Sequence, residues 1–364
     1  MARPRARERG IRIGTLPTGE ANAVTDVPGV RVGHRSVIRG DDGDPHAVRT
    51  GVTAVFPHEG DPWQAPVYAA THILNGYGEL IGINTIREWG ILESPIVLTS
   101  SLQIGKAYDA TVRWIAGRST AAGEAVMPCV TECDDSFLSD VLSFPLSDAD
   151  VASALDAATG GPVREGSVGA GVGMQAFDFK GGIGTASRVL PDDRGGWRVG
   201  VLVMTNHGDR ERLLIDGVRV GEALADEPMP VEHREGSCIA IVATDAPLLP
   251  HQLRRIAERA GLGLARGGSH AANTSGEQLL AFSTATRLPT REPTVTQTVL
   301  ADGADAGGRT LSAIFRATVE ATEEAVVNAM FAAETVVGRD GNTLRAMPVD
   351  RALEVLERHS RLVR

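Results

Sequence analysis

The step from Gly236 to Ser237 carries the most distinctive chemistry in the sequence. A polar segment, Glu222–Glu235, leads into it, and an unbroken apolar run, Cys238–Ala243, follows it. If the Ser237 hydroxyl attacks the carbonyl just before it, the peptide becomes an ester that water can cut. Ser237 would then be a new N-terminus, whose free α-amine has an ordinary pKa of about 7.7–8.0 and can accept a proton near neutral pH. The step therefore indicates a serine nucleophile activated by its own amine, the alternative being an ordinary turn into a buried strand.

Short apolar runs and amphipathic stretches must position this serine. Three runs are typical of strands, namely 51–57, 94–101 and 197–208, and the apolar spacing of residues 105–117 predicts a helix. A second helix is expected over 247–261, capped by Asp245 and stopped by Gly261. Residues 311–338 are expected to form a strand that runs into a long helix. Because strands and helices interleave without strict βαβ alternation, packed sheets covered by helices are favoured over a doubly wound fold.

Composition and charge exclude several classes of function. The net charge of −10 argues against nucleic acid or an anionic membrane surface as a partner. The basic N-terminus has no apolar segment after it, so neither a secretory signal nor a membrane anchor is expected, and residues 1–22 read as a flexible arm. Three cysteines form neither a disulfide framework nor a zinc set, which favours a reducing, cytoplasmic location. The scattered histidines lack metal-binding spacing, and Lys180 is followed by two glycines rather than Ser or Thr, so no metal, phosphate loop or cofactor is expected.

Several long motifs in order carry a family resemblance over almost the whole chain. They include TDVPGVRVGH (25–34), SPIVLTSSLQIGKAYDA (94–110), KGGIGTASR (180–188) and GSCIAIVATDAPLLPHQLRRIAERAG (236–261). With them the chain resembles the DmpA-type aminopeptidases, the group of L-aminopeptidase/D-amidase/D-esterases and β-peptidyl aminopeptidases. The resemblance implies an α+β fold, a four-layer αββα sandwich. It also implies one catalytic domain, 23–364, cleaved into chains 1–236 and 237–364 and assembled as a tetramer of processed units.

The resemblance also assigns roles to individual residues. It implies that Ser237 is the nucleophile, that Ser275 is hydrogen-bonded near it, and that Glu277 lies beside its amine. On a strand, the Ser-x-Glu spacing puts both of the latter side chains on one face, although a solvated turn is the alternative. Asn206 resembles an oxyanion-hole asparagine, since a fixed amide donor stabilises the charge that amide hydrolysis builds on oxygen; the alternative is a turn residue before a glycine. The neighbouring His207 is expected to be structural.

Glu132 resembles the family glutamate that holds the free amino group of the substrate. A carboxylate there favours a charged amine at a set distance from the scissile bond. The sequence departs from the family pattern nearby, with Asp134 where a bulky residue is common and Ser136 where glycine is common. If Asp134 and Asp135 both face the entrance, a basic N-terminal residue would be tolerated or preferred; the alternative is that both point to bulk water and cap a turn.

The expected activity is hydrolysis of the N-terminal residue from short peptides, amino-acid amides or amino-acid esters through a serine acyl-enzyme. Two alternatives are a related acyltransferase of the ornithine acetyltransferase type and a non-catalytic scaffold. The acyltransferases use threonine as nucleophile, which Ser237 argues against. A scaffold gives no reason for Asn206, Ser275 and Glu277 to accompany the Gly236–Ser237 step.

Overall fold

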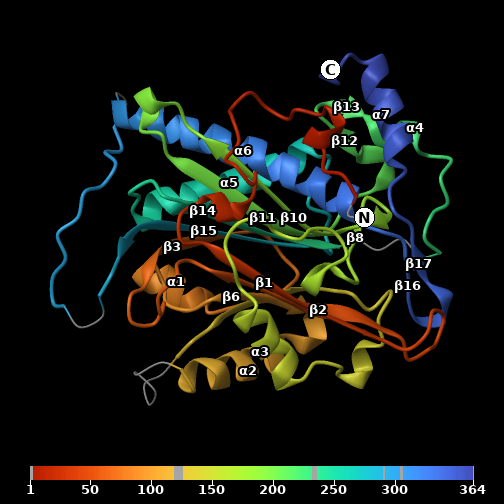
Figure 1. The fold of residues 1–364 in the computed structure, drawn as a ribbon, viewed down its shortest axis with the longest axis horizontal. Helices are drawn as coiled ribbons and strands as arrows, with labels where there is room; N and C mark the ends of the chain where they lie inside the picture. Colours follow the sequence, from red (N-terminus) through yellow and green to blue (C-terminus); the bar gives the residue numbers. More distant parts are fainter. Residues whose placement is uncertain (1–2, 119–125, 232–235, 290–291, 304–305, 364) are drawn as a thin grey trace.

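Two stacked β-sheets with helices on both outer faces form the body of the protein. The computed structural model describes residues 3–118, 126–231, 236–289, 292–303 and 306–363. Figure 1 shows the layers from one side, with the helices α5 (Pro250–Arg266) and α6 (Ala306–Ala332) above one sheet and the helices α2 (Ile104–Ala116) and α3 (Asp148–Asp156) below the other.

The first sheet has five strands in the order β1-β2-β6-β7-β4. Its strands are β1 (Arg31–Arg39), β2 (Val48–Phe56), β4 (Leu80–Ile81), β6 (Ile96–Ser100) and β7 (Cys129–Cys133). Its outer face is covered by α2 (Ile104–Ala116) and α3 (Asp148–Asp156), which pack on apolar side chains of β2, β6 and β7. The runs 51–57 and 94–101 and the helix expected over 105–117 are thereby confirmed.

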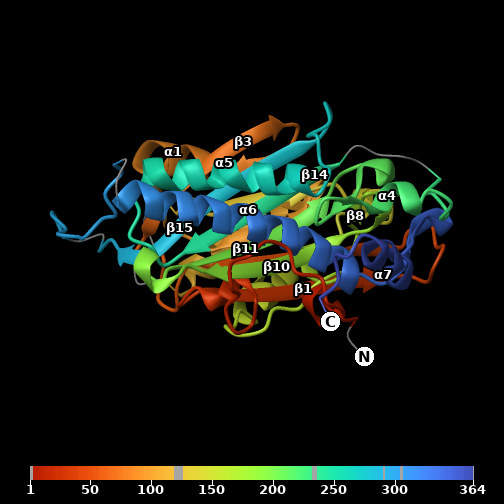
Figure 2. The ribbon, with the colours of Figure 1, turned by 90° about the horizontal axis from the view of Figure 1, so that it is seen from above.

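The second sheet has six strands in the order β10-β11-β14-β15-β3-β5. Its strands are β3 (Val67–Gly76), β5 (Ile91–Leu92), β10 (Gly182–Val189), β11 (Arg198–Asn206), β14 (Ser237–Thr244) and β15 (Gly276–Arg287). The strand β14 lies at the centre, antiparallel to β11 and parallel to β15. Two helices, α5 (Pro250–Arg266) and α6 (Ala306–Ala332), run side by side over its outer face, as Figure 2 shows from above.

Alternating side chains of β14 connect the two cores. Ile239 and Ile241 point between the sheets, whereas Ala240 and Val242 belong to the core under α5 and α6. A strand buried on both faces has no polar face, and this explains the unbroken apolar run after Ser237. The expected four-layer αββα sandwich is confirmed.

Two helix boundaries differ from the sequence expectation. The helix α5 continues through Gly261 to Arg266. Asp245 does not cap it; the Asp245 carboxylate instead accepts hydrogen bonds from the backbone N–H of Arg198 at 2.6 Å and from the Arg198 guanidinium at 3.2 Å. The helix α6 begins at Ala306 and already includes Leu311, so the expected strand does not precede the helix, and the short β16 (Val336–Val337) follows it. The apolar run that suggested a strand instead forms the buried face of this helix, where Leu311 and Ile314 meet the core.

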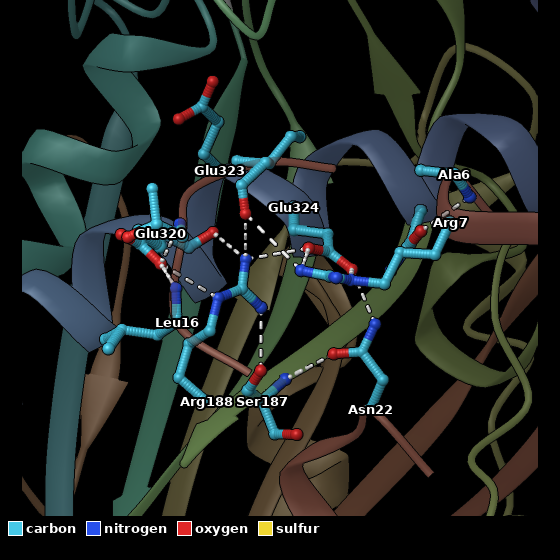
Figure 3. Close-up of polar contacts among 12 residues, drawn as sticks. Ala6, Arg7, Leu16, Asn22, Ser187, Arg188, Glu320, Glu323 and Glu324 are labelled. Atoms are coloured by element: carbon cyan, nitrogen blue, oxygen red, sulfur yellow. Dashed lines mark hydrogen bonds and ion pairs between the residues drawn. The ribbon is translucent and has the colours of Figure 1, made fainter. Parts of the chain in front are cut away.

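The N-terminal segment is anchored rather than loose over its described residues, 3–22. Ile11 and Ile13 are fully buried, and the backbone of Ile11 pairs with Leu362 near the C-terminus. Arg7 and Asn22 donate hydrogen bonds to the carboxylate of Glu324 in α6, at 2.7 and 2.6 Å (Figure 3). The expectation of a flexible arm is therefore wrong for these residues, because its alternating apolar and polar side chains have buried partners.

A fully buried arginine lies at the centre of this anchor. Arg188 of β10 binds Glu324 at 2.8 Å and Glu320 at 3.2 Å, and donates to the carbonyl of Ile13 at 2.7 Å (Figure 3). Although burial pushes the pKa of Glu324 upward, the charges of Arg188 and Arg7 hold it below its usual value. The cluster joins the N-terminal segment, the second sheet and α6 through charge-assisted hydrogen bonds.

The remaining elements are short. They are α1 (Ile83–Trp89), α4 (Val220–Ala223), α7 (Val349–Arg358), and the ribbons β8–β9 (Gln175–Ala176, Phe179–Lys180), β12–β13 (Leu214–Ile215, Val218–Arg219) and β16–β17 (Val336–Val337, Thr343–Leu344). Among the described residues, no helix has both the length and the apolarity that crossing a membrane requires.

Candidate active site

Ser237 is the first residue of β14, at the end of the sheet where the chain enters from Gly236. The main chain at Gly236 passes so close to β11 that a Cβ there would lie 1.5 Å from the carbonyl oxygen of Asn206. Only glycine fits this approach, which explains the residue before the serine. Residues 232–235, the end of the polar segment that leads into this step, lie outside the described residues.

Asn206 lies directly opposite Ser237, as its partner in the antiparallel β11–β14 pair. Its Oδ1 accepts the backbone N–H of Gln175 at 2.8 Å, and its Nδ2 donates to the carbonyl of Asp134 at 3.0 Å. These bonds fix which end of the amide is the donor. Since Nδ2 carries two hydrogens, one remains for a group in front of Ser237.

Ser275 and Glu277 contact each other on the neighbouring strand. Ser275 donates a short hydrogen bond to Oε1 of Glu277, and both side chains are buried. In the parallel pair, Ser237 is opposite Gly276 and Cys238 is opposite Glu277. Paired side chains share a face, so Glu277 lies on the face turned toward α5 and α6, while the Ser237 side chain points between the sheets. The carboxylate is therefore placed beside the main chain of the nucleophile rather than beside its hydroxyl.

One oxygen of Glu277 has a buried and unused acceptor position. No described residue donates to Oε2 with good hydrogen-bond geometry, although the side-chain amide of Asn75, which donates to the backbone carbonyls of Ala271 and Ala272, lies close enough to favour the charged form of Glu277. Burial raises the pKa of Glu277, and the Ser275 hydroxyl partly opposes this. An ammonium group next to Oε2 would satisfy it and restore the charged form.

Glu132 comes from the other sheet, near the end of β7. Its Oε1 accepts the backbone N–H of Glu79 at 2.9 Å, and its Oε2 accepts a short hydrogen bond from the Ser101 hydroxyl. Burial raises the pKa of Glu132, while these two donors partly oppose the rise. The carboxylate is thus held in one orientation by two different segments.

A cavity of about 270 Å³ brings these residues together. Its lining comes from both sheets and comprises Tyr77, Gly78, Ser101, Glu132, Asp134, Asn206, Gly236, Ser237 and Thr274. Of the residues expected from the sequence, Ser237, Asn206 and Glu132 face this cavity, whereas Ser275 and Glu277 lie behind the strand. The serine, an amide donor and a carboxylate can therefore reach one small molecule.

The two aspartates after Glu132 have different surroundings. Asp134 is exposed, lines the cavity, and caps a turn by accepting the backbone N–H and the hydroxyl of Ser136 at 2.9 and 2.8 Å. Asp135 is buried and accepts the Ser100 hydroxyl at 2.6 Å, and burial raises its pKa to about 7. Neither alternative holds for both residues, since Asp134 lines the cavity and caps a turn, whereas Asp135 is buried away from bulk water.

A buried lysine supports the donor side of the site. The ammonium of Lys180 donates to the carbonyls of Gly171, Met174 and Gly181 at 2.9, 2.7 and 2.8 Å. These carbonyls belong to the segment around the β8–β9 ribbon, which also holds the N–H that binds Asn206. The glycine-rich stretch therefore shapes the oxyanion side of the cavity.

Sequence reasoning missed three side chains at the site. Ser101 and Tyr77 line the cavity, and the Cys133 thiol lies close enough to the Ser237 side chain for the serine to influence its pKa. Burial raises the pKa of Cys133 well above its usual value, so the thiol stays neutral. The paired serines that end the apolar run 94–101 were the available signal for Ser101. His207 is buried against the Phe177 ring, and burial lowers its pKa to about 4, as a structural histidine requires.

Comparisons with known proteins give matches over most of the chain. The model of Peptidase family S58 matches residues 22–344. A beta-peptidyl aminopeptidase of Sphingosinicella xenopeptidilytica is 39% identical over 98% of this chain and 92% of its own length. A solved beta-aminopeptidase of Burkholderia sp. superimposes with a TM-score of 0.91 at 42% identity, covering 98% of this chain and 99% of its own. The L-aminopeptidase D-Ala-esterase/amidase of Ochrobactrum anthropi, described as a variant of the Ntn-hydrolase fold, gives 0.91 at 40% identity over 99% and 100%.

Proposed function

Because this chain belongs to peptidase family S58, we propose that it is a self-processing serine aminopeptidase that cuts itself between Gly236 and Ser237. One observation carries the proposal: Ser237 begins a central strand and shares a cavity with Asn206 and Glu132. The family is one of peptidases, so nothing favours an acyltransferase or a scaffold.

Self-cleavage needs only groups at this step. The Ser237 oxygen attacks the Gly236 carbonyl carbon, the C–N bond breaks, and the nitrogen takes the hydroxyl proton, leaving an ester. Water then hydrolyses the ester to a new carboxylate at residue 236 and a free amine and hydroxyl on Ser237. The unused Oε2 of Glu277, next to the main chain of Ser237, supports a place for this amine, whose N–H can donate to it while the nitrogen lone pair stays free to accept a proton.

Substrate hydrolysis uses the same residue in its processed form. The free amine takes the Ser237 hydroxyl proton as the oxygen attacks the scissile carbonyl, and it returns the proton to the leaving amine. The second N–H of Asn206 donates to the oxygen on which negative charge develops. Water enters the acyl-enzyme and releases the acid product, which regenerates Ser237.

Glu132 accounts for the choice of substrates with a free amine. Its buried carboxylate faces the cavity, where the ammonium group of a substrate can donate a charge-assisted hydrogen bond to it. We propose short peptides, amino-acid amides and amino-acid esters as substrates. The names of two relatives, a beta-peptidyl aminopeptidase and an L-aminopeptidase D-Ala-esterase/amidase, support this class.

The test of the proposal is the covalent state of the purified protein. We expect two fragments on a denaturing gel, residues 1–236 and 237–364, with the smaller one beginning Ser-Cys-Ile. The variant Ser237→Ala should remain one chain and be inactive, because no other side chain supplies both hydroxyl and amine. A protein that hydrolyses amino-acid anilides while remaining a single 38.3 kDa chain would refute the proposal.

We also propose that the processed unit forms a homotetramer. Neighbouring exposed apolar side chains, Leu142 at 69% and Phe144 at 64%, support a contact surface on the five-stranded side of the protein. Native mass spectrometry of the cleaved protein tests this, and a monomer at micromolar concentration would contradict it.

A further inference from the structure

A second cavity lies at the opposite end of β6 from the candidate active site. It measures about 240 Å³ and begins at Pro95, just before β6, whereas Ser101 follows the other end of that strand. The two cavities are thus about 20 Å apart along the strand. The second cavity is smaller than the roughly 300–1,000 Å³ usual for drug-sized ligands, so any ligand must be small.

The polar group that stands out in this cavity is Glu93. Its side chain lines the cavity although only 8% of the residue is exposed. Within the described ranges it has neither a hydrogen-bond donor nor a cation as partner. Burial alone raises the pKa of Glu93 to about 7. Its oxygens open into the cavity, so a ligand that fills the cavity must supply a donor to them, and an N–H group can do so.

The walls of the cavity are largely aromatic and apolar. Trp63 and Trp114 are half-buried there, beside Pro62, Pro95, Phe56 and Ile115. Such walls favour a flat apolar group.

Both cations on these walls contact an aromatic ring, although the Nε of Arg31 is buried without a hydrogen-bond acceptor among the described residues. The Arg31 guanidinium lies 4.7 Å from the Phe56 ring centre, and that of Arg118 lies 4.5 Å from the Trp114 ring and binds Asp156 at 3.1 Å. The other charged residues on the lining are Glu59 and Asp61, so the acidic groups outnumber the cations. A positive ligand is therefore favoured over a negative one.

We propose that this cavity is a second binding site, for a small arylalkylamine whose ammonium pairs with Glu93 and whose ring lies against Trp63 and Trp114. The site is independent of the proposed peptidase chemistry, since it shares no lining residue with the Ser237 cavity. Because the amine binds the ionised carboxylate, binding should be about tenfold weaker at pH 6 than at pH 8, given the raised pKa of Glu93. The other charged groups that face the same space are Glu59, Asp61, Arg31 and Arg118.

The experiment is a calorimetric titration of the purified full-length protein with 2-phenylethylamine and with its neutral isostere, 2-phenylethanol. We expect saturable binding of the amine only, accompanied by a change in tryptophan fluorescence. Glu93→Gln preserves the shape and should weaken amine binding about tenfold or more, the usual effect of losing a charge-assisted hydrogen bond. The matched control, Glu59→Gln, alters an exposed acid on the same rim and should change binding less than about fivefold.

A third variant separates this site from the candidate active site. Glu132→Gln should leave 2-phenylethylamine binding unchanged if the amine occupies the second cavity. If binding is lost in Glu132→Gln and kept in Glu93→Gln, the amine occupies the Ser237 cavity, which supports the proposed function and overturns this inference. Equal binding of the alcohol, or no saturable binding of the amine, overturns it as well, and neither result depends on the folding of a variant.

Discussion

Lys180 should control catalysis from behind the site, through the backbone that orients Asn206. Its ammonium binds three carbonyls, and each carbonyl left without a donor costs about 1–3 kcal/mol. Gly171 and Met174 keep backbone donors, from the N–H groups of Met174 at 3.3 Å and Gly181 at 2.9 Å. We therefore expect Lys180→Met to lower the free energy of unfolding by about 1–3 kcal/mol, the value for a single carbonyl.

The effect on activity follows from the bond between the Gln175 N–H and Oδ1 of Asn206. Complete loss of an oxyanion donor lowers kcat by about 10²–10³, and a donor that is only misplaced should lose less. We expect Lys180→Met to reduce kcat at least about tenfold with little change in KM, because Glu132 on the other sheet is untouched.

Steady-state kinetics on an amino-acid anilide measures this, alongside hydrogen exchange of residues 175–180. The chain has one other lysine, Lys106, which pairs with Asp148 at the surface, so Lys106→Met is the matched control. It should change the stability by less than about 0.5 kcal/mol and leave kcat unchanged. If Lys180→Met folds, exchanges its ribbon amides faster and still has the kcat of the unaltered protein, the link from this lysine to Asn206 is refuted.

Three further changes test other parts of the structure. Glu132→Gln should raise KM for free-amine substrates about tenfold or more. Since burial raises the pKa of Glu132, KM of the unaltered enzyme should climb as pH falls through that raised value; equal turnover of N-acetylated substrates would contradict the role. Arg188→Met should lower the free energy of unfolding in urea by about 3–5 kcal/mol, because Glu320 and Glu324 lose a buried partner; an unchanged midpoint would contradict this. Asp134→Asn should reduce the lysyl-to-alanyl anilide rate ratio by about fivefold at most, and molar salt should do the same to the unaltered enzyme. If neither Asp134→Asn nor molar salt changes this rate ratio, Asp134 only caps its turn.

Local patterns predicted the strands well and the ends of helices poorly. The apolar run after Ser237 identified β14, because a strand buried on both faces tolerates no polar residue. Gly261 was read as a helix stop, yet it lies within α5, where the helix packs on β3 and β15 and the tertiary contact outweighs the local preference. The strand expected at the start of 311–338 is wrong for a different reason. A short apolar run such as Leu311–Ile314 does not distinguish a strand from a buried helix.

The site was only partly predictable because it is assembled across the two sheets. Gly236–Ser237 could be interpreted from its own chemistry, while the roles of Asn206 and Glu132 came from a resemblance. No spacing in the sequence indicates that Ser101 would meet Glu132 or that Cys133 would meet Ser237. The first contact depends on the parallel pairing of β6 with β7, and the second on the stacking of β7 against β14, both of which are properties of the whole fold.

The anchored N-terminal segment bears on the fate of the protein after a cut at residue 236. Arg7 and Arg188 would then belong to one polypeptide and Glu320 and Glu324 to the other, while β11 and β14 would join two separate chains. The sandwich would become an obligate heterodimer in which the five-stranded sheet belongs to one chain, while β14 and β15 of the other chain complete the six-stranded sheet. Its unfolding would release two molecules instead of one, so its midpoint should rise with protein concentration, unlike that of Ser237→Ala. Refolding would require a bimolecular encounter between chains that were made as one.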